Sequence, residues 1–169
     1  MTRLIASLVA ALFVLTACNV TTPQLGPDGK PLPSVFRITN SQKNKIPFRV
    51  LDSVNALRVA AGLTPVALSA ELTAAAATQS QDMSIQNRPW HFGSDGSSPI
   101  DRVARTGYAG NMLGENISET FENDVDTLAA WMTEADTRSV IMNPEAKFMG
   151  ISWFQEVSGK IWWTQVFGS

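Results

Sequence analysis

The distribution of cysteine is the feature that most constrains how this chain can fold. The sequence has 169 residues and a single cysteine, Cys18, which directly follows an apolar N-terminal stretch. The chain that follows Cys18 can therefore form no intramolecular disulfide. About 150 residues remain after the leader, which is enough for one domain with a buried core. We therefore expect a fold that is stabilised by side-chain packing alone.

Residues 1–17 are predicted to be a lipoprotein signal peptide. Arg3 precedes a nearly continuous apolar run from Leu4 to Leu15, and this stretch contains no acidic residue. The run is too short for a mature membrane span, and its charge-then-apolar order is typical of an export signal. It ends in the lipobox Leu15-Thr16-Ala17-Cys18. We expect acyl chains on Cys18 to anchor the mature protein to a membrane.

The alternative at this position is a plain signal peptide followed by a free thiol. That arrangement would leave a reactive cysteine in an oxidising compartment, and lipidation removes the difficulty. The expected location is therefore the cell envelope, with the lipid anchor in the outer membrane or on the extracytoplasmic face of the inner membrane.

Residues 18–45 are predicted to be a tether. The segment is polar and contains four prolines and two glycines, a composition that disfavours compact structure. Its one apolar patch, residues 35–38, either docks on the following domain or forms a short edge strand. The whole chain has a net charge of −2, and loss of the leader with Arg3 makes it more negative. Because no basic stripe is present, nucleic acid is not an expected partner.

Residues 46–169 contain the periodic pattern of a single domain. Leu51, Val54 and Leu57 recur at helical spacing, and Ser69 is in the position of a helix N-cap. The run of four alanines at 74–77 predicts a helix that neighbouring elements can approach closely. The predicted helices cover 48–61, 70–85, a short segment from Ser98 to Gly107, and a segment that begins at Asn123 or Asp124.

Strands are predicted at the end of the chain. Residues 149–154 and 160–167 flank the turn signal Ser158-Gly159, which indicates a hairpin. Residues 118–123 are interpreted as a polar spacer. Because the helices come first and the strands later, without β-α-β alternation, an α+β fold is preferred.

The candidate functional stretch runs from Trp90 to Arg102. It contains His91, the only histidine in the chain, in a segment rich in glycine and serine. Histidine is the side chain that ordinarily titrates near neutrality, and loops held by rigid elements often carry functional groups. Asp95 follows four residues later, and Glu115 is expected to return towards the imidazole. A purely structural role, in which His91 hydrogen-bonds Glu115 and fixes the loop, is equally compatible with this pattern.

Five motifs occur in an order that resembles the bacterial branch of the CAP superfamily, the cysteine-rich secretory, antigen 5 and pathogenesis-related 1 proteins, whose domain is also called SCP. The resemblance runs from about residue 50 to residue 168 and implies an α-β-α sandwich with a central antiparallel sheet. The motifs are His91-x-x-x-Asp95-Gly-Ser-x-x-x-x-Arg102-x-x-x-x-Gly-Tyr108, Gly114-Glu-Asn-Ile117, an aliphatic helix with Trp131, Ile141-Met-Asn-Pro144, and Trp163-Thr-Gln-x-Phe-Gly168.

The resemblance also implies a candidate site. In eukaryotic members two histidines and two acidic residues are discussed as a divalent-metal site. Here His91 matches the first histidine and Glu115 the glutamate, and Asp95 is a possible second acid. Trp162 occupies the position of the second histidine, and Thr137 that of another histidine found in many bacterial members. Zinc sites usually need three protein ligands. We therefore expect no cofactor, and at most weak divalent-cation binding by His91, Glu115 and Asp95.

Two classes of function remain open at this point, because one fold can serve many functions. The first is a non-enzymatic binding module for a lipid, peptide, glycan or protein. The second is a hydrolase of an envelope peptide or peptidoglycan, with His91 and Glu115 as an acid–base pair. Nucleophilic catalysis by Ser94, Ser97 or Ser98 is less supported, because no nucleophile-elbow motif accompanies them. The expected groove is lined by Trp90, His91, Asp95, Glu115, Asn116, Trp162 and Trp163, with the 162–163 strand closing one side.

Overall fold

The computed structural model of the chain describes residues 35–120 and 122–169. The predicted signal peptide, the lipobox with Cys18 and the predicted tether up to residue 34 lie outside the described residues. Residues 35–169 form one compact unit. Residues 35–45, which were predicted to belong to the tether, are thus part of this unit in the structure.

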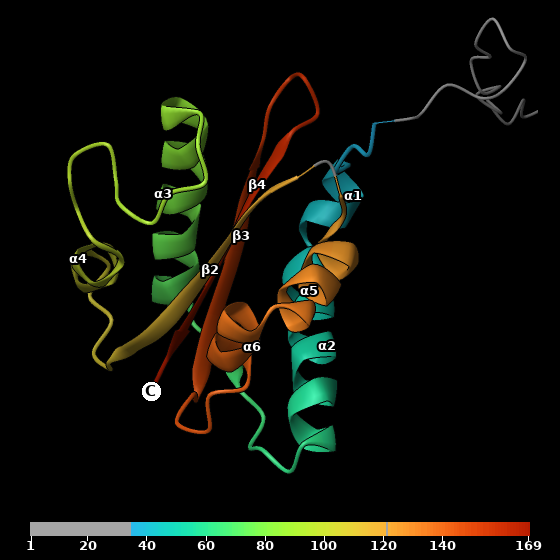
Figure 1. Ribbon diagram of the computed structural model, residues 1–169, viewed down its shortest axis with the longest axis vertical. Helices are drawn as coiled ribbons and strands as arrows, with labels where there is room; N and C mark the ends of the chain where they lie inside the picture. Colours follow the sequence, from blue (N-terminus) through green and yellow to red (C-terminus); the bar gives the residue numbers. More distant parts are fainter. Residues whose placement is uncertain (1–34, 121) are drawn as a thin grey trace, which may run out of the picture. The chain divides into compact units, whose positions relative to one another are not determined.

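A four-stranded sheet lies at the centre of the unit (Figure 1). Its strand order is β1-β3-β4-β2, and β4 pairs antiparallel with both β3 and β2. The short strand β1 pairs parallel with β3, so the sheet is mixed rather than wholly antiparallel. The strands are β1 (Ala67–Leu68), β2 (Met112–Thr120), β3 (Phe148–Gln155) and β4 (Ile161–Gly168).

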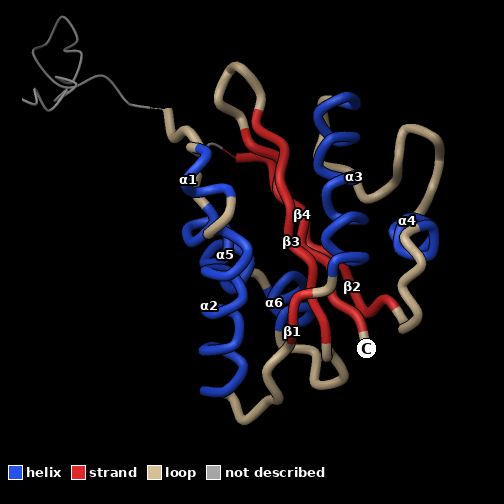
Figure 2. The backbone as a smooth tube through the Cα atoms, turned by 180° about the vertical axis from the view of Figure 1, so that it is seen from behind, coloured by secondary structure: helices blue, strands red, loops and turns tan. Residues whose placement is uncertain are grey.

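Helices cover both faces of this sheet, as the views from opposite sides show (Figures 1 and 2). They are α1 (Asn40–Lys43), α2 (Ile46–Ala60), α3 (Ala70–Gln86), α4 (Pro99–Arg105), α5 (Asp124–Thr133) and α6 (Ala135–Ile141). Helices α3 and α4 lie on one face, and α2, α5 and α6 lie on the other. The predicted α+β class and the α-β-α sandwich are confirmed. No helix in the described ranges combines the length and the apolar character needed to cross a bilayer.

Three predicted helix starts are confirmed by their caps, whereas α2 begins at Ile46, two residues earlier than predicted, without a side-chain cap hydrogen bond. Ser69 accepts a hydrogen bond from the Leu72 backbone N–H at the start of α3. Ser98 and Asp101 form a reciprocal capping box at the start of α4. Of the two alternatives for α5, Asn123 is the cap, because its side chain accepts from two backbone N–H groups.

Four elements were not predicted from the sequence: α1, β1, β2 and α6. Strand β2 includes Ser118 to Thr120, where a polar spacer was predicted. This prediction was wrong because β2 is an edge strand, and edge strands tolerate polar side chains. Helix α6 was not predicted; it is only seven residues long and begins without a side-chain cap hydrogen bond.

The alanine-rich helix α3 lies very close to the sheet. Ala75 and Ala76 are buried, and a Cβ atom placed on Gly150 of β3 would overlap the α3 backbone at Leu72. The close approach predicted for this helix is therefore found on the side of α3 that faces the sheet. Ala74 and Ala77 are exposed, so the helix is not packed closely on every side.

The larger part of the core lies between the sheet and helices α2, α5 and α6, where Trp163 and Phe167 are fully buried. Phe36 and Ile38 pack against this core. The side chain of Gln155 accepts a hydrogen bond from the Ile38 N–H (3.0 Å) and donates to the Phe36 carbonyl (2.8 Å). Of the two alternatives for residues 35–38, docking on the domain is the one observed.

Candidate functional site

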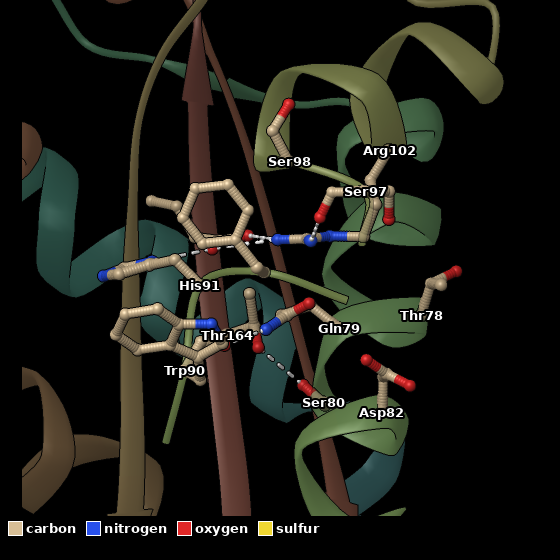
Figure 3. A network of polar contacts seen from close by, with 12 residues as sticks. Thr78, Gln79, Ser80, Asp82, Trp90, His91, Ser97, Ser98, Arg102 and Thr164 are labelled. Carbon is tan, nitrogen blue, oxygen red and sulfur yellow. Dashed lines mark hydrogen bonds and ion pairs between the residues drawn. The ribbon is translucent and has the colours of Figure 1, made fainter. Parts of the chain in front are cut away.

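The loop that carries His91 is fastened to α3 by side chains of that helix. One carboxylate oxygen of Asp82 accepts the backbone N–H of Ser94 (2.6 Å), and the other accepts the Ser94 hydroxyl (2.6 Å). Gln86 donates to the carbonyl of Phe92 (3.0 Å), and Gln79 donates to the carbonyl of Trp90. These bonds hold the loop against α3, from which Gln79 extends towards Trp90 (Figure 3).

His91 and Glu115 are in contact, as predicted. The two groups come from different elements, the loop after α3 and strand β2, and His91 Nδ1 lies 2.9 Å from Glu115 Oε1. Arg102 of α4 also reaches this carboxylate, and its Nη2 donates to Oε1 (3.0 Å) and Oε2 (2.9 Å). The side chain of His91 is 47% exposed, whereas those of Glu115 and Arg102 are each 3% exposed.

This arrangement determines which of the three groups can act on a ligand. Both oxygens of Glu115 accept hydrogen bonds, and its charge is compensated by a buried guanidinium. Because both of its oxygens are used and its side chain is buried, Glu115 offers no free oxygen to a ligand in solvent. Only the imidazole of His91 is presented to solvent, and its second ring nitrogen points away from Glu115 (Figure 3).

The candidate serines do not form a nucleophile–histidine pair. Ser98 is the cap of α4, and the Ser94 hydroxyl donates to Asp82. The backbone N–H of Ser97 donates to Asp95 (2.9 Å). No hydrogen bond joins any of these serines to His91 within the described part of the chain.

Asp95 is directed towards α4 and not towards His91 and Glu115. Its carboxylate accepts a hydrogen bond from Arg105 (2.7 Å), with which it forms an exposed ion pair. Hydrogen bonds from Ser97 and Arg105 hold the pKa of Asp95 well below its usual range. The structure therefore does not bring the three predicted candidates together, because Asp95 is fully engaged elsewhere.

Three predicted groove residues lie away from the site. Asn116 is 1% exposed and donates to the carbonyl of Thr137 on the face covered by α6. Trp162 and Trp163 are fully buried, so neither can line an open groove. Successive side chains of a strand point to opposite faces, so neither Asn116 nor Trp163, which pairs with Ser118, can share a groove with Glu115. Trp162 lies on the same face as Glu115 but is fully buried there, with its indole N–H bonded to Glu156.

The divalent-metal site discussed for eukaryotic CAP proteins does not fit these residues. The oxygens of Glu115 are taken by Arg102 and His91. Trp162, at the position of the second histidine, donates its indole N–H to Glu156 (2.7 Å). Among residues 35–120 and 122–169, no three His, Cys, Asp or Glu side chains gather in a way that could hold a metal ion.

Two residues that hold the site together, Arg102 and Asp82, were not predicted from the sequence as part of it. Arg102 belongs to the same motif as His91, and its place in the first turns of a capped helix was a usable signal. Asp82 carried a weaker signal, because a carboxylate near the end of a helix is most often solvated. Neither could be assigned to a partner, since the pairing depends on how α3, α4 and β2 are arranged.

An exposed aromatic surface surrounds His91, formed by Trp90, His91 and Phe92 together with Ile100 of α4. Trp90 is 44%, Phe92 46% and Ile100 67% exposed. The Trp90 and Phe92 rings have centroids 5.7 Å apart, and the Arg88 guanidinium lies 5.1 Å from the Trp90 ring. A hollow lined by Phe92, Ile100 and residues 112–114 adjoins this surface. Clustered exposed aromatic groups of this kind are typical of interaction sites.

Comparison with known proteins gives a family match and one curated relative. A family model described as the cysteine-rich secretory protein family (CAP) matches residues 51–167. The uncharacterized protein YkwD of Bacillus subtilis is 31% identical over 120 residues, which cover 71% of this chain and 46% of that protein. The chain thus spans about half the length of this relative.

Solved structures share the fold. An outer surface protein of Borrelia burgdorferi matches with a TM-score of 0.69 and 15% identity, covering 80% of this chain and 98% of that one. An extracellular protein of Bacillus anthracis that contains an SCP domain matches with a TM-score of 0.69 and 21% identity. That match covers 79% of this chain and 44% of the other. At these identities the likeness establishes a common fold.

Proposed function

Because the chain belongs to the cysteine-rich secretory protein (CAP) family, we propose that it is an extracytoplasmic CAP module that binds a ligand and catalyses no reaction. The outer surface protein of Borrelia burgdorferi and the extracellular protein of Bacillus anthracis, which share its fold, are consistent with this location. The predicted export signal supports the same placement.

The observation that carries the proposal is the state of Glu115. A hydrolase that used Glu115 itself as a general acid or base would need this carboxylate to face the substrate. Glu115 is instead buried and held by two hydrogen bonds from Arg102. In this arrangement Glu115 orients the imidazole, and Arg102 fixes Glu115. His91 then serves as a positioned polar group in the middle of the aromatic surface.

Turnover by the wild type and by a His91→Ala variant tests the non-enzymatic role. The purified protein is incubated with peptidoglycan sacculi and, separately, with denatured casein, and soluble products are measured. We expect no release above that of His91→Ala with either substrate. Release by the wild type that disappears in His91→Ala would establish the hydrolase and refute the proposal.

Ligand capture tests the aromatic surface. The purified protein is screened against arrays of envelope lipids, glycans and peptides, together with Trp90→Ala and Phe48→Ala. Phe48 is 61% exposed on α2 and serves as a matched aromatic control on the other face of the sheet. We expect ligands retained by the wild type and Phe48→Ala to be lost by Trp90→Ala. Equal retention by both variants would remove the aromatic surface as the binding site.

The proposed membrane anchor is the acylated Cys18. Two or more acyl chains provide durable attachment, because each buried methylene contributes about 0.8 kcal/mol. We expect the intact mass of membrane-extracted protein to correspond to a chain that begins at Cys18 and carries acyl groups. A Cys18→Ser variant is the control and should appear in the soluble fraction. An unacylated wild-type mass would contradict the anchor.

A further inference from the structure

The turn that joins β3 to β4 carries an exposed apolar side chain. Val157 lies in this turn and is 95% exposed, the largest exposed fraction among the large apolar side chains of residues 35–120 and 122–169. Hairpin turns are usually formed by Gly, Asn, Asp, Ser and Pro, and Ser158 and Gly159, with φ +103°, meet that need here. Valine has no turn-forming property of this kind, so the fold itself does not require Val157 at this position.

The described chain begins beside the same turn. Val35 is 45% exposed and lies against Gly159, where a Cβ atom would overlap its side chain. The guanidinium of Arg37 donates to two backbone carbonyls of the turn, at 3.1 and 2.7 Å. We call Val35, Arg37 and residues 156–160 the hairpin end. It lies at the opposite end of the described unit from the loop that follows α2 (Figures 1 and 2).

The proposed acylation of Cys18, on which this inference rests, would hold the hairpin end near a bilayer. Sixteen residues separate Cys18 from Val35. Even when fully extended, a stretch of this length spans no more than about 60 Å. A surface linked in this way meets the bilayer at a high effective concentration, which is highest for the groups nearest the link. An apolar contact too weak to hold a free protein on a membrane can therefore be occupied in an anchored one.

The charges at the hairpin end are compatible with phospholipid. Arg37 is exposed and takes part in none of the ion pairs formed within the described ranges. A guanidinium has five N–H donors, so Arg37 keeps donors for phosphate beyond the two given to the turn. The nearby carboxylates are already bonded, Glu119 to Lys160 and Glu156 to Trp162. We infer that the hairpin end docks on the bilayer that holds the acyl chains of Cys18, with Val157 at the boundary between headgroups and acyl chains.

Fluorescence quenching by lipid tests this contact. The acylated full-length chain with Ser158→Cys is labelled with a fluorophore at that thiol, because acylation leaves no free thiol at Cys18. It is reconstituted into vesicles of phosphatidylethanolamine and phosphatidylglycerol that contain a nitroxide-labelled phospholipid. Thr64→Cys, in the exposed loop after α2, gives the matched label at the opposite end. We expect the label at 158 to be quenched and the label at 64 to remain bright. Equal quenching at both positions, or none at 158, overturns the inference.

Variants of exposed valines show whether Val157 makes the contact. Val157→Asp places a charge at the turn and should abolish quenching of the label at 158. Val59→Asp makes the same change at a valine of α2 that is 57% exposed, and should leave the quenching unchanged. Full quenching in Val157→Asp would refute the docking. A dimer of the Cys18→Ser chain in solution that Val157→Asp dissociates would assign the hairpin end to a second copy of the chain instead.

The anchor and the docking are tested separately. The intact mass of the reconstituted protein reports whether Cys18 is acylated. A Cys18→Ser chain with a hexahistidine tag in place of residues 1–17, held on vesicles by a nickel-chelating lipid, provides the same link without acylation. Quenching at 158 in this chain, together with an unacylated natural protein, would support the docking surface and remove only the anchor at Cys18. An acylated protein without quenching at 158 would remove the docking and leave the anchor in place.

Discussion

Among the single residues of the site, the buried pair of Arg102 and Glu115 contributes more to stability than the exposed imidazole that it supports. Removing one member of a buried ion pair leaves an uncompensated charge, which typically costs about 3–5 kcal/mol. Arg102→Met should lower the free energy of unfolding by about that amount. His91→Ala should lower it by less than about 1 kcal/mol, because its side chain is 47% exposed. Urea unfolding at neutral pH measures both effects.

A double variant is the control for the charge argument. In Arg102→Met/Glu115→Gln the uncompensated carboxylate is removed, so part of the lost stability should return. If the two changes are simply additive, or if His91→Ala destabilises as much as Arg102→Met, then the buried charge is not the cause.

Glu156 provides a pH-dependent contribution at the turn that joins β3 to β4. Its carboxylate accepts hydrogen bonds from the Trp162 indole N–H (2.7 Å) and the Ser84 hydroxyl (3.0 Å). The bond from Trp162 is the main reason that the pKa of Glu156 lies below its usual value of 4.5. A carboxyl group whose folded pKa is depressed stabilises the fold above the unfolded pKa and loses this effect as the pH falls through the folded pKa.

We therefore expect the stability difference between the wild type and Glu156→Gln to be constant above the usual value and to shrink as the pH falls below it. Thermal unfolding from neutral to acidic pH measures this difference. A gap in melting temperature that is independent of pH would show that hydrogen-bond geometry, rather than ionisation, accounts for the effect of the substitution.

At the scale of elements, three helix starts and the hairpin turn were predicted correctly, because each depends on residues that are adjacent in the sequence. Ser69 and Ser98 marked helix starts because capping depends on a few adjacent residues, and Ser158-Gly159 marked the hairpin for the same reason. Strand β2 was missed because its strand character comes from pairing with β4, which is distant in sequence. The site was partly predictable. His91 and Glu115 were found from two motifs, whereas the sheet face of Asn116 and Trp163 depends on a strand register that the sequence does not reveal.

Arg58 illustrates an element-scale interaction that the sequence did not reveal. It lies in α2, is fully buried, and burial lowers its pKa. Its guanidinium donates to the carbonyls of Thr64, Ile141 and Asn143 at 2.7–2.9 Å, and to that of Ala146 at 3.2 Å. A single side chain thus joins α2 to the end of α6 and to the turn before β3. An arginine in an amphipathic helix pattern is ordinarily interpreted as solvated, so the prediction overlooked it.

Arg58→Met should therefore destabilise the fold strongly, because it leaves several buried carbonyls without donors. We expect a loss of roughly 2–4 kcal/mol in the free energy of unfolding. Arg105→Met is the comparison, since Arg105 is 61% exposed and its partner Asp95 is 54% exposed. A loss for Arg58→Met no larger than that for Arg105→Met would mean that water replaces the guanidinium at these carbonyls.

At the scale of the whole molecule, the described unit contains no cysteine, because Cys18 lies before Val35. Its stability must come from the two core clusters on either side of the sheet and from buried polar contacts. We expect a fragment of residues 35–169 to unfold in one cooperative transition with the same midpoint in the presence and absence of reductant. Two separate transitions, or a midpoint that shifts with reductant, would contradict this expectation.

Residues 35–45 should contribute measurably to that transition. Arg37 donates to the carbonyls of Glu156 (3.1 Å) and Val157 (2.7 Å), and Gln155 bonds the backbone on both sides of Arg37. Phe36 and Ile38 also cover part of the core.

A fragment of residues 46–169 loses these contacts and exposes apolar surface. It should still fold but be less stable by about 2–4 kcal/mol, since burying one large apolar side chain contributes about 1.5–3 kcal/mol. The variant Phe36→Ala/Ile38→Ala in the longer fragment should reproduce most of this loss. Equal stability of the two fragments would mean that residues 35–45 are held by the domain without supporting it.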